Sequence, residues 1–357
     1  MSAEYETRLY QPNDELQIAP LLKSAYGHWP FFDIKCSPVD HWRWKYIDSP
    51  HHKNLLIEIL HENEIIASSH NIMHNLIING KKYLASYGTD ACVHPKFQGR
   101  GLYKILMNSY AQHVRGDFTY MVTVNPKVLS SSSQKRETPY RFPYIVKSLN
   151  RISDINQHIN ANELNHETRR KLKHLIDRAR SSPIIPPDPN IKITQVNQFD
   201  KNIESFLEQV NESYKFIKHR TRDYLNWRYL DPRAGNYNVR MVVENETVIG
   251  YGVFRINKLE KYHVGYIVDL LTFPDRLDTA EALLLDGLGL FRDNKVNQIV
   301  SQVVEKNPFE RLFNKYGFYG GDGNRHIFYN YTGDDDLGLD KISSEKFHFV
   351  FGDLTGI

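Results

Sequence analysis

The sequence has 357 residues, enough for two domains of ordinary size, and its 41% of hydrophobic residues is typical of a folded protein. Its formal net charge of +3 is small for this length, so nothing in the totals calls for a nucleic-acid partner. No apolar run approaches the about 18 residues of a transmembrane helix, so we expect no membrane span. The two cysteines, Cys36 and Cys92, stand in no disulfide or metal spacing, so we expect a cytoplasmic chain without a bound metal.

The first half of the chain, residues 1–155, predicts helices followed by a meander of antiparallel strands. Between the second and third strands, Asn79-Gly80 is a strong signal for a tight hairpin. An amphipathic helix and a buried strand complete the half. In chain order the expected elements are helix Glu15 to Tyr26, a short helix around Trp44, strands Asn54 to Leu60, Ile65 to Ile78 and Lys82 to Val93, helix Gly101 to Arg115, and strand Phe118 to Val124.

Residues 156–190 predict a helix and a linker, because Ala161 to Arg180 has helical composition and Ser181 to Asn190 is rich in proline, which fits neither a helix nor a central strand. A second folded half follows over residues 191–332, and residues 333–357 form a tail. The expected elements are helix Phe199 to Tyr214, strands Asn238 to Val243, Thr247 to Ile256 and Tyr262 to Thr272, helix Thr279 to Asn294, strand Gln298 to Val304, helix Pro308 to Tyr316, and a tail strand, Phe347 to Phe351.

The two halves resemble each other in sequence. The matched pairs are Trp44 to Asp48 with Trp227 to Asp231, Glu64 to Ala67 with Thr247 to Gly250, Tyr87 to Pro95 with Tyr266 to Pro274, and Asn125 with Asn307. The third match sets Asp90 over Asp269. Several matches in one order at a nearly constant offset indicate a duplicated domain. Each copy orders helices, a meander and a strand–helix–strand unit, so we expect an α/β or α+β fold with a mixed, mostly antiparallel sheet flanked by helices.

The segment from Val93 to Lys104 combines the features of an anion site. A strand ends, a short loop with Gly99 and Gly101 follows, and a helix begins, so unpaired N–H groups meet the positive end of a helix dipole. The glycines let the backbone approach a ligand closely, and Arg100 and Lys104 add charged donors. The segment therefore predicts a diphosphate site, although it matches neither the P-loop nor the dinucleotide fingerprint.

The run Gln98-Gly99-Arg100-Gly101-Leu102-Tyr103 resembles the motif with which GNAT-superfamily acyltransferases bind the pyrophosphate of coenzyme A, except that Tyr103 replaces a small residue. The resemblance implies two tandem GNAT-like domains and an acyl-CoA co-substrate, either acetyl-CoA or a short-chain acyl-CoA. It also implies that only the first copy keeps the site, because the matching loop of the second has Asp275 and Asp278 in place of the glycines. The residues expected to hold the coenzyme are Ala91, Val93, Gln98, Gly99, Arg100, Gly101, Leu102, Tyr103, Lys104 and Asn125.

The same resemblance implies direct attack of an amine on the thioester. The strand from Lys82 to Val93 would part from its neighbour, the Ala91 N–H would hold the acyl carbonyl as an oxyanion donor, and Val93 would hold the pantetheine arm.

The base that takes the amine proton has several candidates. Asp90 is the first, and its counterpart Asp269 makes a structural role equally suitable. His70 and His74 on the neighbouring strand are alternatives. Tyr87 is placed to donate a proton to the leaving thiolate, and its high ordinary pKa makes it a poor base.

The expected acceptor is the primary amine of a small molecule, bound near Tyr26, Trp29 and His74. The layout is similar to that of bacterial N-acyltransferases that modify nucleotide-linked (dTDP or UDP) amino sugars for surface polysaccharides. The basic run from Lys215 to Arg222 either binds the diphosphate of such an acceptor or forms a solvated helix face. An amino acid, an aminoglycoside or a protein N-terminus remain alternative acceptors, and a non-catalytic acyl-CoA-binding protein is the alternative to an enzyme. We expect a monomer or a homodimer.

Overall fold

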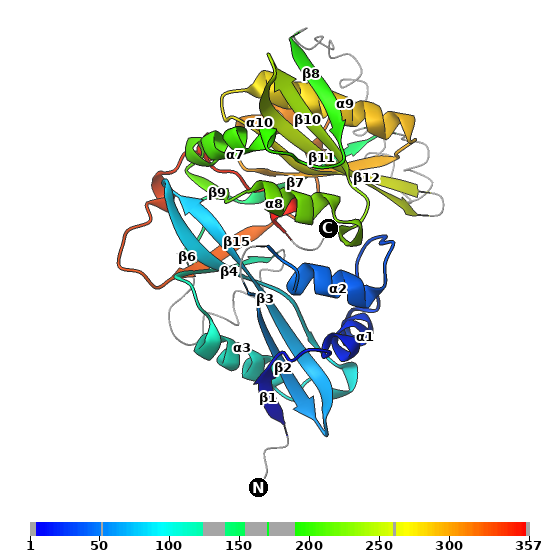
Figure 1. Ribbon diagram of the computed structural model, residues 1–357, viewed down its shortest axis with the longest axis vertical. Helices are drawn as coiled ribbons and strands as arrows, with labels where there is room; N and C mark the ends of the chain where they lie inside the picture. Colours follow the sequence, from blue (N-terminus) through cyan, green and yellow to red (C-terminus); the bar gives the residue numbers. More distant parts are fainter. Residues whose placement is uncertain are drawn as a thin grey trace.

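The computed structural model describes residues 5–50, 53–123, 140–153, 170, 190–259 and 262–354. The chain forms two lobes stacked along the long axis of the molecule, each built on one sheet with helices on both faces (Figure 1). This is the α/β layer fold that the sequence predicts. Asn125 and most of the helix and linker expected over residues 156–190 lie outside the described residues.

The first sheet contains eight of the described strands. Across it they run in the order β1 (Glu6–Leu9), β2 (Leu55–His61), β3 (Glu64–Ile78), β4 (Lys81–Val93), β5 (Phe118–Thr123), β15 (His326–Tyr331) and β6 (Tyr140–Arg141), and β9 (Phe216–Lys218) joins β3. The hairpin predicted at Asn79-Gly80 is confirmed, since both residues have positive φ, 49° and 79°, as a tight turn between β3 and β4 requires.

The second sheet repeats this arrangement. Its order is β14 (Tyr319–Gly320), β7 (Val146–Ile152), β13 (Gln298–Val304), β12 (Tyr262–Thr272), β11 (Thr247–Leu259), β10 (Asn238–Glu244) and β8 (Ile191–Val196). In both sheets one pair of strands is parallel, β4 with β5 and β12 with β13, and the other pairs described are antiparallel. The duplication seen in the sequence is therefore a duplication of sheet topology.

Helices cover both faces of each sheet. In lobe one, α1 (Glu15–Tyr26) and α2 (Pro38–Tyr46) pack on one face, and α3 (Leu102–His113) packs on the other through Leu102 and Leu106. In lobe two, the first face carries α7 (Asn202–Ser213), α8 (Arg222–Leu225) and the π-helical turn η2 (Asn226–Leu230), and the second carries α9 (Leu277–Asp293) and α10 (Pro308–Lys315). Short 3-10 turns are η1 (Pro95–Phe97), η3 (Pro232–Ala234), η4 (Leu339–Lys341), η5 (Ser344–Lys346) and η6 (Phe351–Asp353). Among the described helices, none has the length and apolarity needed to cross a membrane.

The two lobes exchange strands. β7 follows β5 in the chain but pairs with β13 in the second sheet, while β15 comes from the second half but pairs with β5 in the first sheet. Each exchange gives a parallel strand an antiparallel outer neighbour, which satisfies its backbone hydrogen bonds. The expected halves, residues 1–155 and 191–332, therefore do not coincide with the two sheets, because no local pattern states which copy a closing strand joins.

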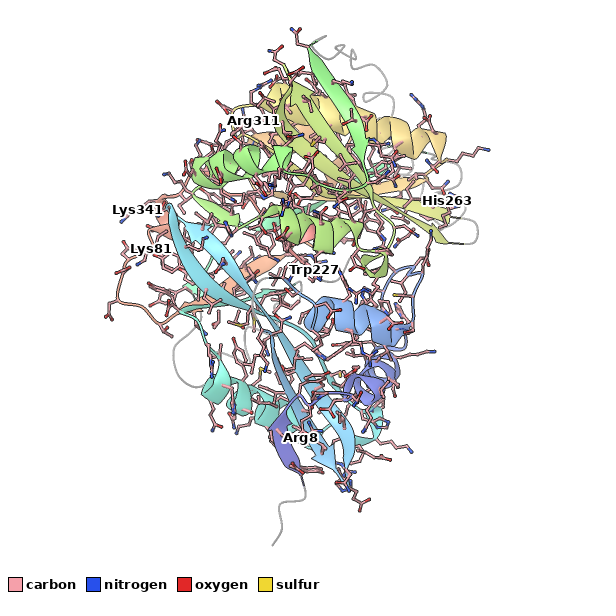
Figure 2. All side chains as sticks on the ribbon, in the orientation of Figure 1. Arg8, Lys81, Trp227, His263, Arg311 and Lys341 are labelled. Atoms are coloured by element: carbon pink, nitrogen blue, oxygen red, sulfur yellow. The ribbon has the colours of Figure 1, made fainter. Side chains whose placement is uncertain are left out.

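A pair of tryptophans from the repeated blocks joins the lobes. Trp44 and Trp227 stack with ring centroids 5.0 Å apart and 26° between the rings. Each indole N–H donates to the backbone carbonyl of the other tryptophan, at 2.9 and 3.0 Å. Figure 2 shows Trp227 at the level where the two lobes meet. The reciprocal bonds mean that the two copies face each other through equivalent surfaces.

The C-terminal tail is buried from Phe347 to Phe349 and from Phe351 to Leu354, but it forms no strand within residues 333–354, so the strand expected over Phe347 to Phe351 is wrong. Phe347 makes one isolated bridge with Phe216 and the following residues are irregular. The alternating apolar pattern suggested a strand with one buried face. In the structure the polar His348 between the phenylalanines is also buried, because the segment passes between the lobes and is covered on both sides.

Candidate active site

A cleft opens in lobe one where two parallel strands diverge. β4 and β5 pair only over Ala85–Tyr87 and Phe118–Tyr120. Beyond Tyr87, β4 stays paired with β3, while no described strand pairs with its other edge. The gap widens into a cleft of about 440 Å³. Its lining includes Gly88 to Ala91 of β4, Tyr103, Met107 and Tyr110 of α3, Thr119 to Thr123 of β5, and Phe328 to Asn330 of β15.

The backbone N–H groups of Ala91 and Val93 face this open edge. In an antiparallel ladder, successive residues direct their N–H groups to opposite sides. His94 donates its N–H to the Ile66 carbonyl of β3 at 2.8 Å, so Val93, one residue earlier, points away from β3. Ala91 is two residues before Val93 and points the same way. The open edge of β4 therefore has two backbone donors, of which Ala91 belongs to the cleft lining.

The start of α3 lies beside the same cleft, because Tyr103 in its first turn lines it. Gly99 and Gly101 both have positive φ, 77° and 78°, a conformation that other residues rarely adopt. The first hydrogen bond of the helix runs from the Lys104 N–H to the Gly101 carbonyl at 3.0 Å. The N–H groups of Leu102 and Tyr103 precede it, so they are the unpaired donors that make a helix start bind anions.

Side chains hold this loop in place and charge its surface. Gln98 donates from Nε2 to the Val93 carbonyl at 3.3 Å, which ties the loop to the end of β4. Leu102 is buried in the core under α3, whereas Lys104 is exposed. Arg100 is exposed too, with its guanidinium 5.0 Å from the centre of the Phe97 ring. Tyr103 lines the cleft and is 53% exposed.

Comparison with known proteins identifies the architecture. No protein-family model and no curated protein matches the sequence. Two crystal structures of Saccharomyces cerevisiae N-myristoyltransferase, one with myristoyl-CoA and one with myristoyl-CoA and inhibitors, match at 11% identity with TM-scores of 0.61 and 0.64. These matches cover 92% and 98% of this chain and 83% and 87% of the other. An Enterococcus faecalis protein of unknown function, described as a probable N-acyltransferase, matches at 11% identity and a TM-score of 0.61 over 92% of this chain and 73% of its own. The chain has the tandem GNAT fold.

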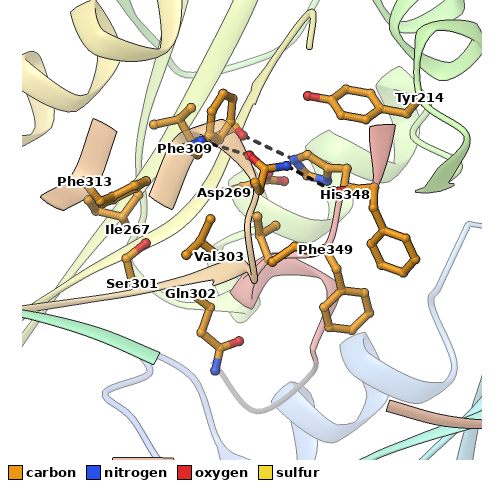
Figure 3. Close-up of a pocket in the computed structure, with 15 residues that line it drawn as sticks. Tyr214, Ile267, Asp269, Ser301, Gln302, Val303, Phe309, Phe313, His348 and Phe349 are labelled. Carbon is orange, nitrogen blue, oxygen red and sulfur yellow. Dashed lines mark hydrogen bonds between the residues drawn. The ribbon is translucent and has the colours of Figure 1, made fainter. Parts of the chain in front are cut away.

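The second GNAT copy has the same opening, but its own tail fills it. β12 and β13 pair over Val264–Tyr266 and Gln298–Val300 and then diverge, as β4 and β5 do. Figure 3 shows His348 and Phe349 of the tail in this region, and His348 Nε2 lies 3.3 Å from the Leu270 carbonyl. The space that remains is about 20 Å³, room for about one water molecule. Among the described residues, none fills the opening of the first GNAT copy in this way.

Asp90 is anchored in the first GNAT copy by three donors. Its Oδ2 accepts hydrogen bonds from Lys45 Nζ at 2.7 Å, from the Tyr46 hydroxyl at 2.5 Å and from Trp29 Nε1 at 3.2 Å. Burial raises the pKa of the carboxyl, but the Lys45 charge and the bonds from Lys45 and Tyr46 outweigh burial and bring the pKa to about 2. So weak a base is unsuited to taking a proton from an amine. The geometry favours the structural role of Asp90.

The second GNAT copy repeats this anchored carboxylate. Asp269 accepts a bond from the Tyr229 hydroxyl at 2.8 Å and forms a buried ion pair with Arg220 at 3.3 Å. Tyr46 and Tyr229 hold matching positions in the two tryptophan blocks. Within the basic run, Arg220 is 1% exposed and Lys218 is 5% exposed, so neither is available to a diphosphate, and Phe216–Lys218 form strand β9 rather than a solvated helix face.

His70, expected as an alternative base, is fully buried beside Asp90 of β4. Its Nε2 lies 3.0 Å from the Trp42 indole nitrogen and its Nδ1 lies 3.1 Å from the Asp90 carbonyl oxygen. Burial lowers the pKa of His70 to about 4, because the charged ring would lose its hydration. A neutral ring with both nitrogens engaged does not accept a further proton near neutral pH.

His74 and Tyr87 lie behind the opening, packed against Tyr120. His74 Nε2 is 3.0 Å from the Tyr120 hydroxyl, and the Tyr87 ring stacks on Tyr120 at 5.1 Å. Burial raises the pKa of Tyr87, so its hydroxyl keeps its proton. Of these three, Tyr120 reaches the cleft lining.

The two aromatic residues expected to bind the acceptor differ in accessibility. The Tyr26 hydroxyl donates to the Ala91 carbonyl at 2.7 Å, and the ring is 37% exposed at the open edge of β4. Trp29 is buried beside Asp90. The geometry therefore leaves Tyr26 as the residue that an acceptor could touch.

Several residues around the site escape reasoning from sequence. Lys45, Tyr46 and Trp42 hold Asp90 and His70, and Tyr120 closes the opening from behind. The repeated tryptophan block contains Lys45 and Tyr46, so the repeat itself was the available signal for them. Tyr120 had no comparable signal, because its place depends on where β5 leaves β4.

Proposed function

We propose that this chain is an acyl-CoA-dependent N-acyltransferase that works in the cleft of the first GNAT copy. One observation carries the proposal: the first turn of α3 and the open edge of β4 line the same cleft, through Tyr103 and Ala91. A coenzyme A thioester needs one group of donors for its diphosphate and another for its thioester carbonyl. The helix start supplies N–H groups for a diphosphate, and the β4 edge supplies a donor for the thioester carbonyl.

The co-substrate that fits is acetyl-CoA or another short acyl-CoA. N-myristoyltransferase, which shares this fold, carries bound myristoyl-CoA in its crystal structures, and this supports an acyl-CoA as donor. Behind the opening, however, the stacked rings of Tyr87 and Tyr120 and the fully buried Phe118 form a packed core. We infer that this core stops a long acyl chain from entering between the strands.

In the proposed reaction the free amine attacks the thioester carbonyl carbon. A C–N bond forms and the carbonyl oxygen takes the negative charge, which the Ala91 N–H stabilises. The oxyanion then collapses, the C–S bond breaks, and coenzyme A leaves as a thiolate. The amine proton passes to water in the open cleft, and the thiolate takes a proton from water, so the products are an amide and free coenzyme A.

For the acceptor, we propose a small molecule with a primary amine. Nucleotide-linked amino sugars are the first compounds to test, because Tyr26 and Phe31 offer exposed rings, 5.7 Å apart, for stacking near the open edge. Arg220 is buried, so it is not available to bind their diphosphate.

The test is release of free thiol from acetyl-CoA across a panel of amines, with the acylated product identified by mass. The panel includes dTDP- and UDP-linked amino sugars, amino acids, aminoglycosides and a peptide with a free N-terminus, and myristoyl-CoA replaces acetyl-CoA in a parallel series. We expect amine-dependent thiol release with acetyl-CoA and none with myristoyl-CoA. Tight binding of acetyl-CoA without release for any amine would instead support a non-catalytic acyl-CoA-binding protein.

A further inference from the structure

We propose that His70 is a positioning residue that presets the Ala91 N–H as oxyanion donor, an inference that rests on the proposed acyltransferase function. The three groups involved form a buried chain: the Trp42 indole, the His70 imidazole, and the peptide group that joins Asp90 to Ala91. This gives His70 a purpose other than that of a base, and it explains why a titratable ring is fully buried beside the open edge of β4.

The hydrogen bonds fix which nitrogen of His70 carries the proton. An indole nitrogen is a donor only. Trp42 Nε1, 3.0 Å away, therefore donates to His70 Nε2, which must be unprotonated. In the neutral ring the proton then sits on Nδ1, and Nδ1 donates to the Asp90 carbonyl oxygen at 3.1 Å. Trp42 thus selects the tautomer that can hold this carbonyl.

Holding the Asp90 carbonyl also aims the Ala91 N–H. A trans peptide group is planar, and its C=O and N–H point in opposite directions. With the carbonyl turned to His70 on the β3 side, the N–H of the same peptide points to the open edge of β4, where the thioester would lie. A hydrogen bond to the carbonyl also polarises the peptide and strengthens its N–H as a donor.

The peptide needs this support because the strand is irregular at this point. The pairing of β3 with β4 shifts between Ser68 and His70, and Asp90 has a φ of 47°, which is unfavourable for a residue other than glycine. The shift takes the Asp90 carbonyl out of the ladder, and His70 replaces the missing backbone donor. The Asp90 side chain is fixed at the same time by Lys45 and Tyr46. A strained backbone persists where its surroundings determine it in this way.

Lobe two provides an internal comparison. The repeat that sets Ala67 over Gly250 sets His70 over Val253, which cannot donate a side-chain hydrogen bond. Asp269, the counterpart of Asp90, has no positive φ. The anchored peptide is therefore present in the copy with the glycine loop and free opening, and it is absent from the copy whose opening the tail fills. The pairing of β11 with β12 also shifts at the matching point, between Val253 and Phe254, but lobe two has neither the positive φ nor the side chain that holds the peptide.

The test is infrared difference spectroscopy of acetyl-CoA labelled with ¹³C at the thioester carbonyl, bound to wild-type protein and to His70→Leu and His70→Asn. We expect binding to the wild type to lower the carbonyl stretching frequency, and His70→Leu to return it toward the value of free acetyl-CoA. Acetyl transfer to hydroxylamine, a probe amine that is neutral at pH 7, should fall about 10- to 100-fold in kcat. His70→Asn keeps a side-chain N–H and should recover part of both effects.

Two further measurements separate positioning from loss of structure. The dissociation constant of coenzyme A should change by less than about threefold in His70→Leu, because the helix start that binds the diphosphate is untouched. Val253→Ala, the counterpart in lobe two, is the control for destabilisation and should leave the carbonyl frequency unchanged. If His70→Leu does not fold, Trp42→Phe removes the donor that selects the tautomer and should raise the frequency by a smaller amount.

The outcomes distinguish this inference from the proposed function. A wild-type protein that binds no acetyl-CoA would contradict the proposed function. A wild type that lowers the carbonyl frequency, together with a folded His70→Leu that lowers it equally and keeps its kcat, would overturn the role of His70 alone.

Discussion

At the scale of single residues, the buried aspartate of lobe one has a structural role rather than a catalytic one. Asp90 and Asp269 lie at matching points of the two copies. Each accepts a hydrogen bond from the tyrosine of its tryptophan block, and each forms an ion pair, Asp90 with Lys45 and Asp269 with Arg220. Removing one partner of such a pair destabilises a protein much more than replacing both partners with apolar residues, because the partner that remains is a buried, uncompensated charge. The sequence repeat predicted the matching carboxylates but not their partners, since Lys45 and Arg220 come from different positions in the two copies.

Replacing Asp90 tests this structural role. Asp90→Asn should lower the free energy of unfolding at pH 7 by about 3–5 kcal/mol, measured by urea denaturation, because Lys45 stays buried without its counter-charge. Since the pKa of Asp90 is held near 2, its contribution is present above the ordinary value of 3.8 and is lost as the pH falls toward 2. The control is Asp335→Asn, which breaks the exposed pair with Lys81 and should cost less than about 1 kcal/mol. Unchanged stability with a lost pH dependence of the rate would return Asp90 to the role of base.

Glu58 predicts a pH dependence of the opposite sign. This carboxyl is buried in the middle of β2, where burial first and the neighbouring Asp14 second raise its pKa to about 9. A raised pKa means that the stabilising contribution is present below the ordinary value of 4.5 and is lost as the pH rises through about 9. Glu58→Gln should therefore reduce the fall in melting temperature between pH 6 and pH 9. The control, Glu64→Gln, changes an exposed carboxylate on β3 and should leave that fall unchanged.

At the scale of elements, local patterns predicted what local forces build. The two strand segments and the Asn79-Gly80 turn signal placed β3, β4 and their hairpin, and glycine placement marked the start of α3. The prediction of a strand in the C-terminal tail was wrong because strand formation there depends on contacts with distant parts of the chain. An alternating segment pairs as a strand only if a sheet edge is free beside it, and Phe347 to Phe351 instead fills space between the lobes. Burial was predictable from its composition, whereas the partner that buries it was not.

Phe347→Ala tests whether the end of the C-terminal tail is part of the hydrophobic core. Phe347 is 1% exposed and stacks on Phe216 with ring centroids 4.2 Å apart. Removing the ring should lower the free energy of unfolding by about 3–5 kcal/mol through lost burial and the cavity left behind. Phe31→Ala, at a 43% exposed phenylalanine, is the control and should change it by less than about 1 kcal/mol. Equal small effects would show that the tail is not packed between the lobes in solution.

At the scale of the whole molecule, the exchange of β7 and β15 makes each sheet depend on both halves of the chain. The stacked tryptophans, Trp44 and Trp227, add a second connection. We therefore expect one cooperative unfolding transition in calorimetry, with equal calorimetric and van't Hoff enthalpies. Two separable transitions would mean that the lobes fold as independent domains, as a division at residues 155 and 191 would suggest.

The central claim is that one chain holds one coenzyme, at the helix start of lobe one. Calorimetric titration of acetyl-CoA tests it most directly, with Gly101→Glu placing a carboxylate at that helix start and Leu277→Glu placing the same side chain at the start of α9 in lobe two. We predict one site per chain in the wild type, loss of binding in Gly101→Glu, and unchanged binding in Leu277→Glu. Wild-type affinity retained in a folded Gly101→Glu, or lost in Leu277→Glu, would contradict the claim.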